Sequence, residues 1–535
     1  MKPDFCQVLN IGLQKYPKLS SKILRYGTAG FREKAIELPH VMYRMGLLAV
    51  LKSKEEQGKT VGLMVTASHN PEEDNGIKLC GPSGEMINQE WEQFATLLVN
   101  SENAELDKSL QHIVEKSKLN YNISANVFLA KDTRSSGTKL LEAALDGVRI
   151  ISGQAKDFGL LTTPQLHFVV VCQNNSLYGK PTVEGYYEKL SNAYNVLLSS
   201  GKEKESKRYD PELFVDGANG IGALKFKELL DYLNLLKVHV FNDGSKGVLN
   251  FKCGADYVKI EQKPPEGCSI IAGKRYASFD GDADRLVYFY KDIKGIFHLL
   301  DGDKIATLMG KYLKELVEQT GLNLSIRIIQ TAYANGSSTQ YIKKTLKIPV
   351  VFVPTGVKHL HHEAMKYDIG IYAEANGHGT VVFSDHAKSQ LKNLSCSTRK
   401  IMAQKLLNSI NLINETVGDA ISNLLFVESV LHDYDWTVDE WDSLYYDFPS
   451  RQLKVKVPDR QVIQTTDADQ KCVAPKGLQE AIDDIISQYK NARSFVRPSG
   501  TEDIVRVYAE ADTQEHADVV AHEISQLVKK FTDSS

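Results

Sequence analysis

Short apolar runs alternate with amphipathic stretches along most of the 535-residue chain. Runs of strand length occupy residues 61–65, 351–353, 369–372 and 505–508. Residues 303–319 instead place apolar side chains at helical spacing, and residues 517–531 repeat this pattern near the end of the chain. The alternation predicts an α/β fold built from layers of helices and sheets.

Composition and charge narrow the class of protein. Hydrophobic residues make up 42% of the chain and charged residues 24%, which excludes wholesale disorder. The length predicts about three or four domains, at roughly 150 residues each. The net charge is only −3, so there is no basic excess to attract nucleic acid or an anionic membrane. We expect neither partner.

Cysteine usage and hydropathy indicate a location. The seven cysteines are scattered and form no CxxC pair, which is typical of reduced thiols. No apolar run reaches the roughly 18 residues that a membrane-spanning helix needs. The first residues also lack the charged-then-apolar pattern of a secretory signal. We therefore expect a cytoplasmic protein.

Four polar loops share the layout of strand, tight loop and strand. They cover residues 65–71, 279–285, 374–380 and 497–503. Each combines glycine, hydroxyl, carboxylate or cationic side chains that an apolar core would not accept unpaired. Because loops held by rigid strands commonly carry function, these four are the candidate sites.

The loop at 279–285 carries three carboxylates, Asp280, Asp282 and Asp284. In extended chain, residues two apart point the same way, so the three can converge. Close like charges repel unless a cation lies between them, and oxygen ligands favour Mg²⁺, Ca²⁺ or Mn²⁺ over zinc. An EF-hand does not fit, because Arg285 stands where that loop needs glycine. The pattern favours Mg²⁺ completed by phosphate and water, with a solvated acidic turn as the alternative.

The loop after residues 61–65 carries Ser68, followed by His69. A serine hydroxyl needs activation to act as a nucleophile, and the G-x-S-x-G elbow of hydrolases is absent. A phosphoserine would supply strong acceptor oxygens, which the aspartate loop lacks. Ser68 is therefore a candidate phosphate carrier, although on spacing alone a turn serine that caps its own loop is the simpler interpretation.

The loop at 497–503 suits an anion. Arg497 offers a fork that matches phosphate, while Ser499 and Thr501 add hydroxyl donors. Gly500 allows the backbone to approach closely, and Arg506 lies on the following strand as a second cation. The alternative is a surface turn with an ordinary salt bridge.

The loop at 374–380 combines the carboxylate of Glu374, the amide of Asn376 and the imidazole of His378 with two glycines. Such acceptors and amides suit the vicinal hydroxyls of a sugar, and a plain hairpin is the alternative. The glycine-rich segment at 27–32 is a weaker signal. It either lines a site through Arg32 or forms an N-terminal turn.

Taken together, the four loops resemble those of the α-D-phosphohexomutase superfamily and follow the family's order. The likeness runs from residue 26 to about residue 511. Residues 374–378, Glu-Ala-Asn-Gly-His, resemble the acetylglucosamine branch of that family. The glucose and mannose branches usually carry serine where Asn376 stands.

The resemblance implies four domains around a central cleft: three related α/β domains with mixed sheets, and a smaller C-terminal α+β domain. They would carry the phosphoserine, metal, sugar and phosphate loops, in that order, at residues 1–175, 176–295, 296–440 and 441–535.

The resemblance also implies an activity, the interconversion of N-acetylglucosamine 6-phosphate and N-acetylglucosamine 1-phosphate in the pathway to UDP-N-acetylglucosamine. Ser68 would carry the phosphoryl group, bind Mg²⁺ together with the three aspartates, and exchange phosphate through a sugar 1,6-bisphosphate. Arg285 would offset charge. Substrate contacts would come from Glu374, Ala375, Asn376, His378, Arg497, Pro498, Ser499, Gly500, Thr501 and Arg506.

The general base stays open among Lys78, His69, Arg32 and His378, with Lys78 favoured by family position. The expected partner is a small phosphosugar, and the chain would be a monomer or homodimer. Alternatives are a mutase for glucose or mannose phosphates, a metal-dependent phosphatase, and an inactive phosphosugar-binding protein.

Overall fold

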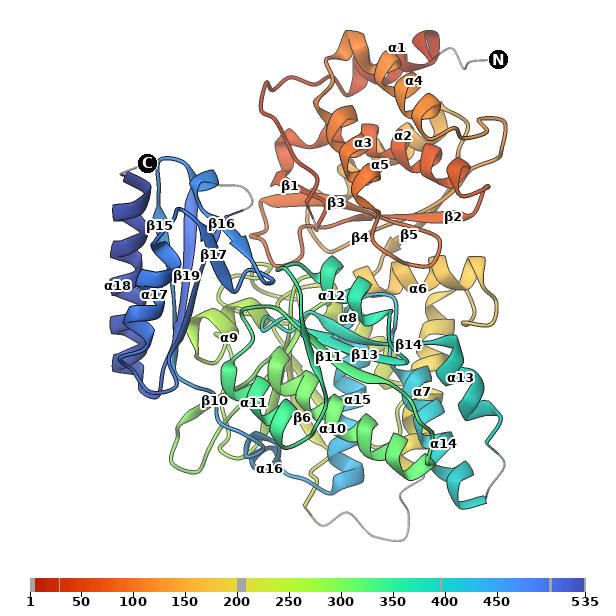
Figure 1. Cartoon of the computed structure of the whole chain (residues 1–535). Coiled ribbons are helices and arrows are strands. Elements are labelled where there is room, and N and C mark those ends of the chain that lie inside the picture. Colours follow the sequence, from red (N-terminus) through yellow and green to blue (C-terminus); the bar gives the residue numbers. More distant parts are fainter. Residues whose placement is uncertain (1–4, 28, 200–207, 395–396, 500–502, 534–535) are drawn as a thin grey trace. The chain divides into compact units, whose positions relative to one another are not determined.

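The computed structural model describes residues 5–27, 29–199, 208–394, 397–499 and 503–533 (Figure 1). The chain forms two compact units. One combines Met1–Leu299 with Asn408–Asp435, and the other combines Leu300–Leu407 with Trp436–Ser535. Within the described part of the chain, no helix has both the length and the apolar character to cross a membrane.

The first unit begins with a five-stranded mixed sheet of strand order β1-β3-β2-β4-β5. Its strands are β1 (Phe31–Lys34), β2 (Thr60–Val65), β3 (Asp74–Cys80), β4 (Asn126–Lys131) and β5 (Gln154–Leu160). Helices α2 (Pro39–Glu55), α3 (Gln89–Asn100) and α5 (Gly137–Ile150) lie on one side of it and α6 (Thr163–Asn174) on the other (Figure 1). Covered on both faces, β2 is buried at all six positions, which gives its loop a rigid base.

A second mixed sheet in the same unit has the order β10-β9-β8-β6-β7. Its strands are β6 (Glu212–Asp216), β7 (Lys237–Phe241), β8 (Arg275–Phe279), β9 (Leu286–Lys291) and β10 (Phe297–Leu300). Helix α15 (Ala420–Tyr434) packs against α7 (Val183–Ser199) and β9, although it comes much later in the chain. Glu428 of α15 pairs with Arg275 at the start of β8, 2.7 Å away.

The second unit contains a four-stranded sheet of order β12-β11-β13-β14. Its strands are β11 (Ile326–Gln330), β12 (Val350–Phe352), β13 (Ile369–Ala373) and β14 (Gly379–Phe383). Helix α10 (Gly302–Thr320) packs on this sheet, and the Asp301 carboxylate caps it by accepting from the N–H groups of Asp303 and Lys304.

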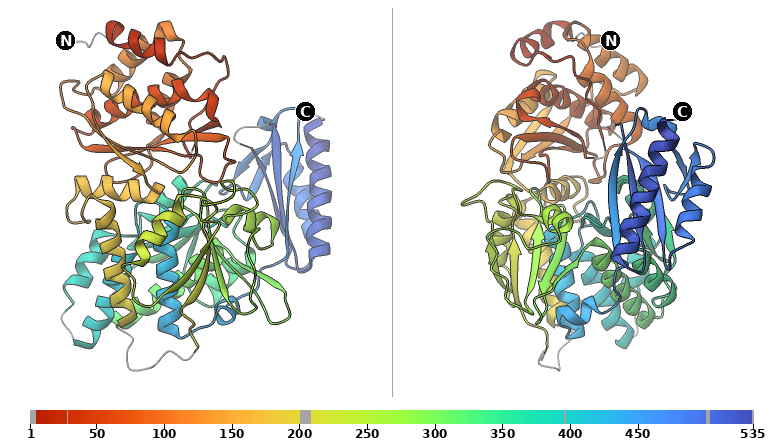
Figure 2. Two further views of the ribbon diagram at one scale, coloured as in Figure 1. Left: turned by 180° about the vertical axis from the view of Figure 1, so that it is seen from behind. Right: turned by 90° about the vertical axis from the view of Figure 1, so that its left-hand side faces the viewer.

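The last part of the second unit is a small antiparallel sheet of order β15-β19-β18. Its strands are β15 (Ser450–Lys456), β18 (Arg493–Pro498) and β19 (Ile504–Glu510). Helices α17 (Leu478–Ile486) and α18 (Gln514–Asp533) cover one face (Figure 2). The α/β class, the mixed sheets and the smaller C-terminal α+β part are confirmed.

The layout predicted for the four polar loops is also confirmed. Each joins an antiparallel pair of strands: β2 with β3, β8 with β9, β13 with β14 and β18 with β19. The predicted helix at 303–319 is α10, and the one at 517–531 lies within α18.

Candidate active site

Ser68 lies three residues beyond the end of β2 and is fully buried. Its backbone is left-handed, with φ +52°. Its hydroxyl donates a hydrogen bond to Asp280 Oδ2, 2.7 Å away, within the first compact unit. The serine loop and the aspartate loop, 212 residues apart in sequence, therefore meet.

The three aspartates converge as predicted, with a carboxylate oxygen from each within 4.8 Å of the others, and all three are buried. The reason given from the sequence was wrong, because the loop is a turn and not an extended segment. Ala283 is left-handed, with φ +58°, and its N–H donates to the Asp280 carbonyl. A Cβ at Gly281 would lie 2.5 Å from the Ser68 carbonyl oxygen, so only glycine allows this approach.

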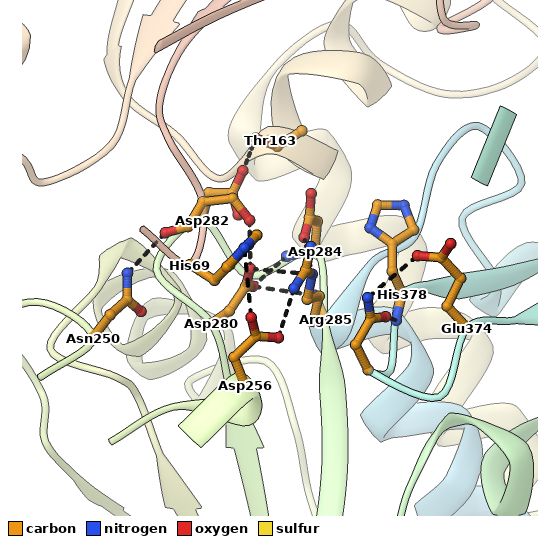
Figure 3. A network of polar contacts seen from close by, with 12 residues as sticks. His69, Thr163, Asn250, Asp256, Asp280, Asp282, Asp284, Arg285, Glu374 and His378 are labelled. Atoms are coloured by element: carbon orange, nitrogen blue, oxygen red, sulfur yellow. Dashed lines mark hydrogen bonds and ion pairs between the residues drawn. The ribbon is translucent and has the colours of Figure 1, made fainter. Parts of the chain in front are cut away.

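Asp282 is held by two donors. Lys78 Nζ lies 2.9 Å from Asp282 Oδ2 and 3.1 Å from Asp284 Oδ2. Thr163 Oγ1 donates to Asp282 Oδ2 at 2.6 Å (Figure 3). Burial and Asp284 would raise the pKa of Asp282, but Lys78 and Thr163 hold that pKa below its ordinary value. Burial alone would lower the pKa of Lys78, but the two carboxylates raise it, so the ammonium group stays charged at neutral pH.

The donor set fits a hard divalent cation. All three ligands are carboxylates, and no donor among the described residues reaches Asp282 Oδ1 although that oxygen is buried. Burial, followed by the charges of Asp284 and Asp282, holds the pKa of Asp280 well above its ordinary value. A cation between the carboxylates would remove this repulsion, so the residues fit Mg²⁺.

Arg285 closes the aspartate loop through a partner that sequence reasoning missed. Its Nη1 donates to Asp256 Oδ1 at 2.6 Å, and its Nε lies 3.8 Å from Asp284 Oδ1 and 3.9 Å from Asp280 Oδ2 (Figure 3). His69 Nε2 lies 3.5 Å from the second oxygen of Asp256. Burial, followed by the charge of Arg285, lowers the pKa of His69 to about 3, so the ring is neutral at neutral pH.

Arg32 lies against the serine loop and has a hydrogen-bond donor that is not paired. Its Nη1 donates to Asn70 Oδ1 at a long 3.3 Å, while its buried Nε has no hydrogen-bond partner in the part of the chain that the structure describes. A guanidinium that has an unused donor and contacts Asn70, two residues after Ser68, is suited to bind a phosphate.

The loop at 374–380, which was predicted to bind the sugar, lies in the second unit and is held in shape by hydrogen bonds between its own polar groups. The Glu374 N–H donates to the His378 carbonyl at 2.9 Å, and the His378 N–H donates to Asn376 Oδ1 at 3.0 Å. Asn376 Nδ2 donates to Glu374 Oε2 at 3.2 Å. The turn thus fixes the Glu374 and Asn376 side chains next to each other, with Ala375 between them.

The phosphate loop follows β18, whose last residue is Pro498. Arg497 faces Arg506 directly across the β18–β19 pair. Two cations at directly opposed positions repel, which an anion between them would relieve. In this structure the Asp469 carboxylate lies 3.3 Å from Arg497 Nε. Ser499, the residue after Pro498, is buried. Gly500 and Thr501, which were also predicted to bind phosphate, lie outside the described residues.

Comparison with known proteins gives matches along the whole chain. Family models described as phosphoacetylglucosamine mutase AMG1, domain II and domain III, match residues 179–287 and 301–436. Models of phosphoglucomutase/phosphomannomutase, for the alpha/beta/alpha domain I and the C-terminal domain, match residues 49–106 and 453–527.

Relatives that match over nearly their full length carry the same enzyme name as the family models of domains II and III. The human phosphoacetylglucosamine mutase is 54% identical over 529 residues, which cover 96% of each protein. A crystal structure of Aspergillus fumigatus N-acetylphosphoglucosamine mutase with GlcNAc-6P and magnesium is 44% identical, covers 99% of this chain and 100% of that one, and has a TM-score of 0.95. A serine-to-alanine variant of the Aspergillus enzyme with glucose 1,6-bisphosphate is 43% identical with a TM-score of 0.93, over 99% of this chain and 100% of that chain.

Proposed function

The chain belongs to the phosphoacetylglucosamine mutase family, and from that membership we infer its reaction. It interconverts N-acetylglucosamine 6-phosphate and N-acetylglucosamine 1-phosphate, with Mg²⁺ as cofactor and a sugar 1,6-bisphosphate as intermediate. This reaction is favoured over the alternative of a glucose or mannose phosphate mutase, because the full-length relatives carry the acetylglucosamine name.

We propose Ser68 as the phosphate carrier, and the observation that carries this is its 2.7 Å hydrogen bond to Asp280 beside the other two carboxylates. In the first transfer, the bond between phosphorus and Ser68 Oγ breaks as a sugar hydroxyl oxygen bonds to phosphorus and loses its proton to a base. In the second transfer, Ser68 Oγ bonds to the phosphorus of the other phosphate, the bond from that phosphorus to its sugar oxygen breaks, and the sugar oxygen takes up a proton from the protonated base. Placement and charge neutralisation dominate such transfers.

The aspartates and nearby cations share the electrostatic work. Asp280, Asp282 and Asp284 would hold Mg²⁺ together with a phosphoserine oxygen, and the ion would supply Lewis-acid charge to the phosphoryl oxygens. Lys78 balances two of the carboxylates at 2.9 and 3.1 Å. Arg32, with its unused buried donor, would bind the phosphate on Ser68.

We propose that residues of the second unit bind the sugar and the non-reacting phosphate of the substrate. Glu374 and Asn376, held side by side by their own hydrogen bond, would accept from and donate to sugar hydroxyls, with Ala375 and His378 beside them. Arg497 and Arg506, opposed across the strand pair, would bind the phosphate that is not reacting, aided by Ser499 and its neighbours.

The domain division remains part of the proposal, at 1–175, 176–295, 296–440 and 441–535. It is supported by the four main sheets, which follow one another along the chain in these ranges, except that β10 of the second sheet lies just past residue 295. A cytoplasmic location is proposed from the scattered cysteines and the hydropathy pattern. A monomeric or homodimeric state is proposed alongside the family resemblance.

The test is turnover of N-acetylglucosamine 6-phosphate with Mg²⁺ and a trace of bisphosphate, followed by phosphorus NMR. Ser68→Ala should abolish isomerisation, because the alanine side chain has no oxygen to receive the phosphate. Ser53→Ala is the matched control, since Ser53 is also fully buried but donates to the Lys59 carbonyl away from the aspartates. Wild-type turnover by Ser68→Ala, or steady release of inorganic phosphate by the native enzyme, would contradict the proposal.

A further inference from the structure

The left-handed backbone of Ser68 needs an explanation. A serine at φ +52° costs free energy relative to the ordinary regions, and such a conformation persists only where its surroundings enforce it. The conformation also matters for chemistry, because it sets the direction in which the hydroxyl leaves the backbone. The groups that bind the Ser68 N–H and carbonyl therefore determine whether Oγ faces Asp280.

Arg134 binds the carbonyl side of the loop. Its Nη2 donates to the carbonyls of Ser68 and Asn70 at 2.9 and 3.0 Å, and its Nη1 donates to those of Pro71 and Asp74 at 2.6 and 3.2 Å. Its Nε donates to an Asp132 carboxylate oxygen at 3.1 Å. Every N–H group of this buried guanidinium is thus used: three bind carbonyls of the serine loop, one binds the carbonyl of Asp74 at the start of β3, and one binds Asp132.

Asp132 and Thr66 bind the other side of Ser68. The Ser68 N–H donates to Thr66 Oγ1 at 2.9 Å, and the Thr66 hydroxyl donates onward to Asp132 Oδ2 at 2.6 Å. Because Asp132 accepts the Thr66 proton, the oxygen of Thr66 is left to accept from Ser68. All three side chains are fully buried, so water does not compete for these bonds.

The topology explains why these residues meet. Strands β2 and β4 are parallel neighbours, with Val65 paired to Lys131, so the loops that follow them leave the sheet at the same edge. The segment Asp132 to Arg134 therefore lies beside the segment Thr66 to Ser68. Asn250 adds a further donor to the Ser68 carbonyl, at 2.8 Å, from the loop before α9 (Ala255–Glu261).

We propose that Thr66, Asp132 and Arg134 are positioning residues for phosphoryl transfer: they hold Ser68 in its left-handed conformation so that its oxygen is aimed at the aspartate loop. They touch neither the aspartates nor any proposed substrate group. The proposal rests on the proposed role of Ser68. It assigns a share of the transfer rate to Thr66, a loop residue given no role from the sequence, and to Asp132 and Arg134, which lie outside all four loops.

The first test compares Thr66→Val with Thr66→Ser. Valine keeps the shape but removes the acceptor for the Ser68 N–H, whereas serine keeps the hydroxyl. We expect Thr66→Val to lower kcat by about 10- to 100-fold, since misplacement of a reacting group by about 1 Å has effects of this size. The rate at which bisphosphate phosphorylates Ser68 should fall equally, while KM changes by less than about twofold. Thr66→Ser should recover most of the native kcat.

The second test compares Arg134→Lys with Arg44→Lys, and it separates positioning from stability. Arg44 is an equally buried arginine in the same unit, and it donates to the carbonyls of Leu98, Val99 and Ser101, far from the serine loop in sequence. Both variants lose donors to backbone carbonyls and should melt at lower temperature. Only Arg134→Lys should also lower kcat and Ser68 phosphorylation at a temperature where both remain folded.

Native kcat in folded Thr66→Val would overturn the inference, and so would equal losses of kcat in the two arginine variants. If Arg134→Lys does not fold, the two threonine variants decide alone. Ser68→Ala separates this inference from the proposed function. If Ser68→Ala is active, Ser68 is not the phosphate carrier and the proposed function fails. If Ser68→Ala is inactive but Thr66→Val is fully active, only the positioning role of Thr66, Asp132 and Arg134 is ruled out.

Discussion

Lys78 was favoured as the general base from its family position, but its contacts indicate that its charge is what matters. The ammonium group lies 2.9 Å from Asp282 and 3.1 Å from Asp284. At such distances each ion pair is worth about 5 kcal/mol before desolvation, for an effective dielectric constant of about 20. Removing one partner of a buried pair commonly costs about 3–5 kcal/mol, because the remaining charge is left uncompensated.

Lys78→Met and Lys78→Arg therefore test the charge. Methionine leaves two carboxylates without their cation, so we expect kcat to fall by about 10²- to 10³-fold, as for loss of a charge-stabilising donor. Arginine keeps the positive charge but is a much weaker base, and we expect it to retain activity within about tenfold of native. Phosphorus NMR of isomerisation, at saturating Mg²⁺ and substrate, measures both.

If Lys78→Arg is as inactive as Lys78→Met, charge is not what the site requires and a proton-accepting lysine is favoured instead. If Lys78→Met keeps native kcat, Lys78 has neither role. Thermal unfolding of both variants with Mg²⁺ present is the control, because a loss of folded protein would imitate a loss of rate.

Two further predictions concern ion pairs in the first unit, one partly buried and one fully buried. In Asp256→Asn, Arg285 loses its 2.6 Å partner and can turn to Asp284 and Asp280, which lie 3.8 and 3.9 Å away. Arg285 would then compete with Mg²⁺ for these carboxylates, so the Mg²⁺ concentration for half-maximal activity should rise. An unchanged Mg²⁺ titration would contradict this. In Glu428→Gln, Arg275 loses a fully buried carboxylate, so the free energy of unfolding should fall by about 3 kcal/mol while the Mg²⁺ titration stays native. Chemical denaturation measures the loss, and a change below about 1 kcal/mol would show that the pair is not needed for stability.

The local architecture could be predicted from the sequence because each signal is short in range. Apolar runs bounded by polar loops correctly marked β2, β13 and β19, and helical spacing marked α10. The four polar loops stood out because their side chains have no place in a core. The convergence of the three aspartates was also foreseen, but the left-handed Ala283 that produces it was not, since nothing in the sequence favours that conformation for alanine.

The residues that contact the serine and aspartate loops from elsewhere in the fold could not be predicted, because their partners lie far away along the chain. Asp256 acts on Arg285, and Asn250 reaches Ser68 from 182 residues away. Neither residue belongs to a motif. Arg134 offered one usable signal, since a polar segment directly after a strand parallel to β2 must emerge at the same edge of the sheet as Ser68. The return of residues 408–435 to the first unit had no local signal at all.

Charge explains why the chemistry could still be predicted before the geometry was known. Three carboxylates and a phosphoserine carry about five negative charges, of which Mg²⁺ offsets two. The sequence therefore required further cations near the serine, and the structure shows Lys78 on two of the carboxylates, Arg285 close to two, and Arg32 against the serine loop. These three cations offset most of the remaining charge, although Arg285 shares its charge with Asp256, so phosphate can leave Ser68 and return without a large change in the electrostatic cost of the site.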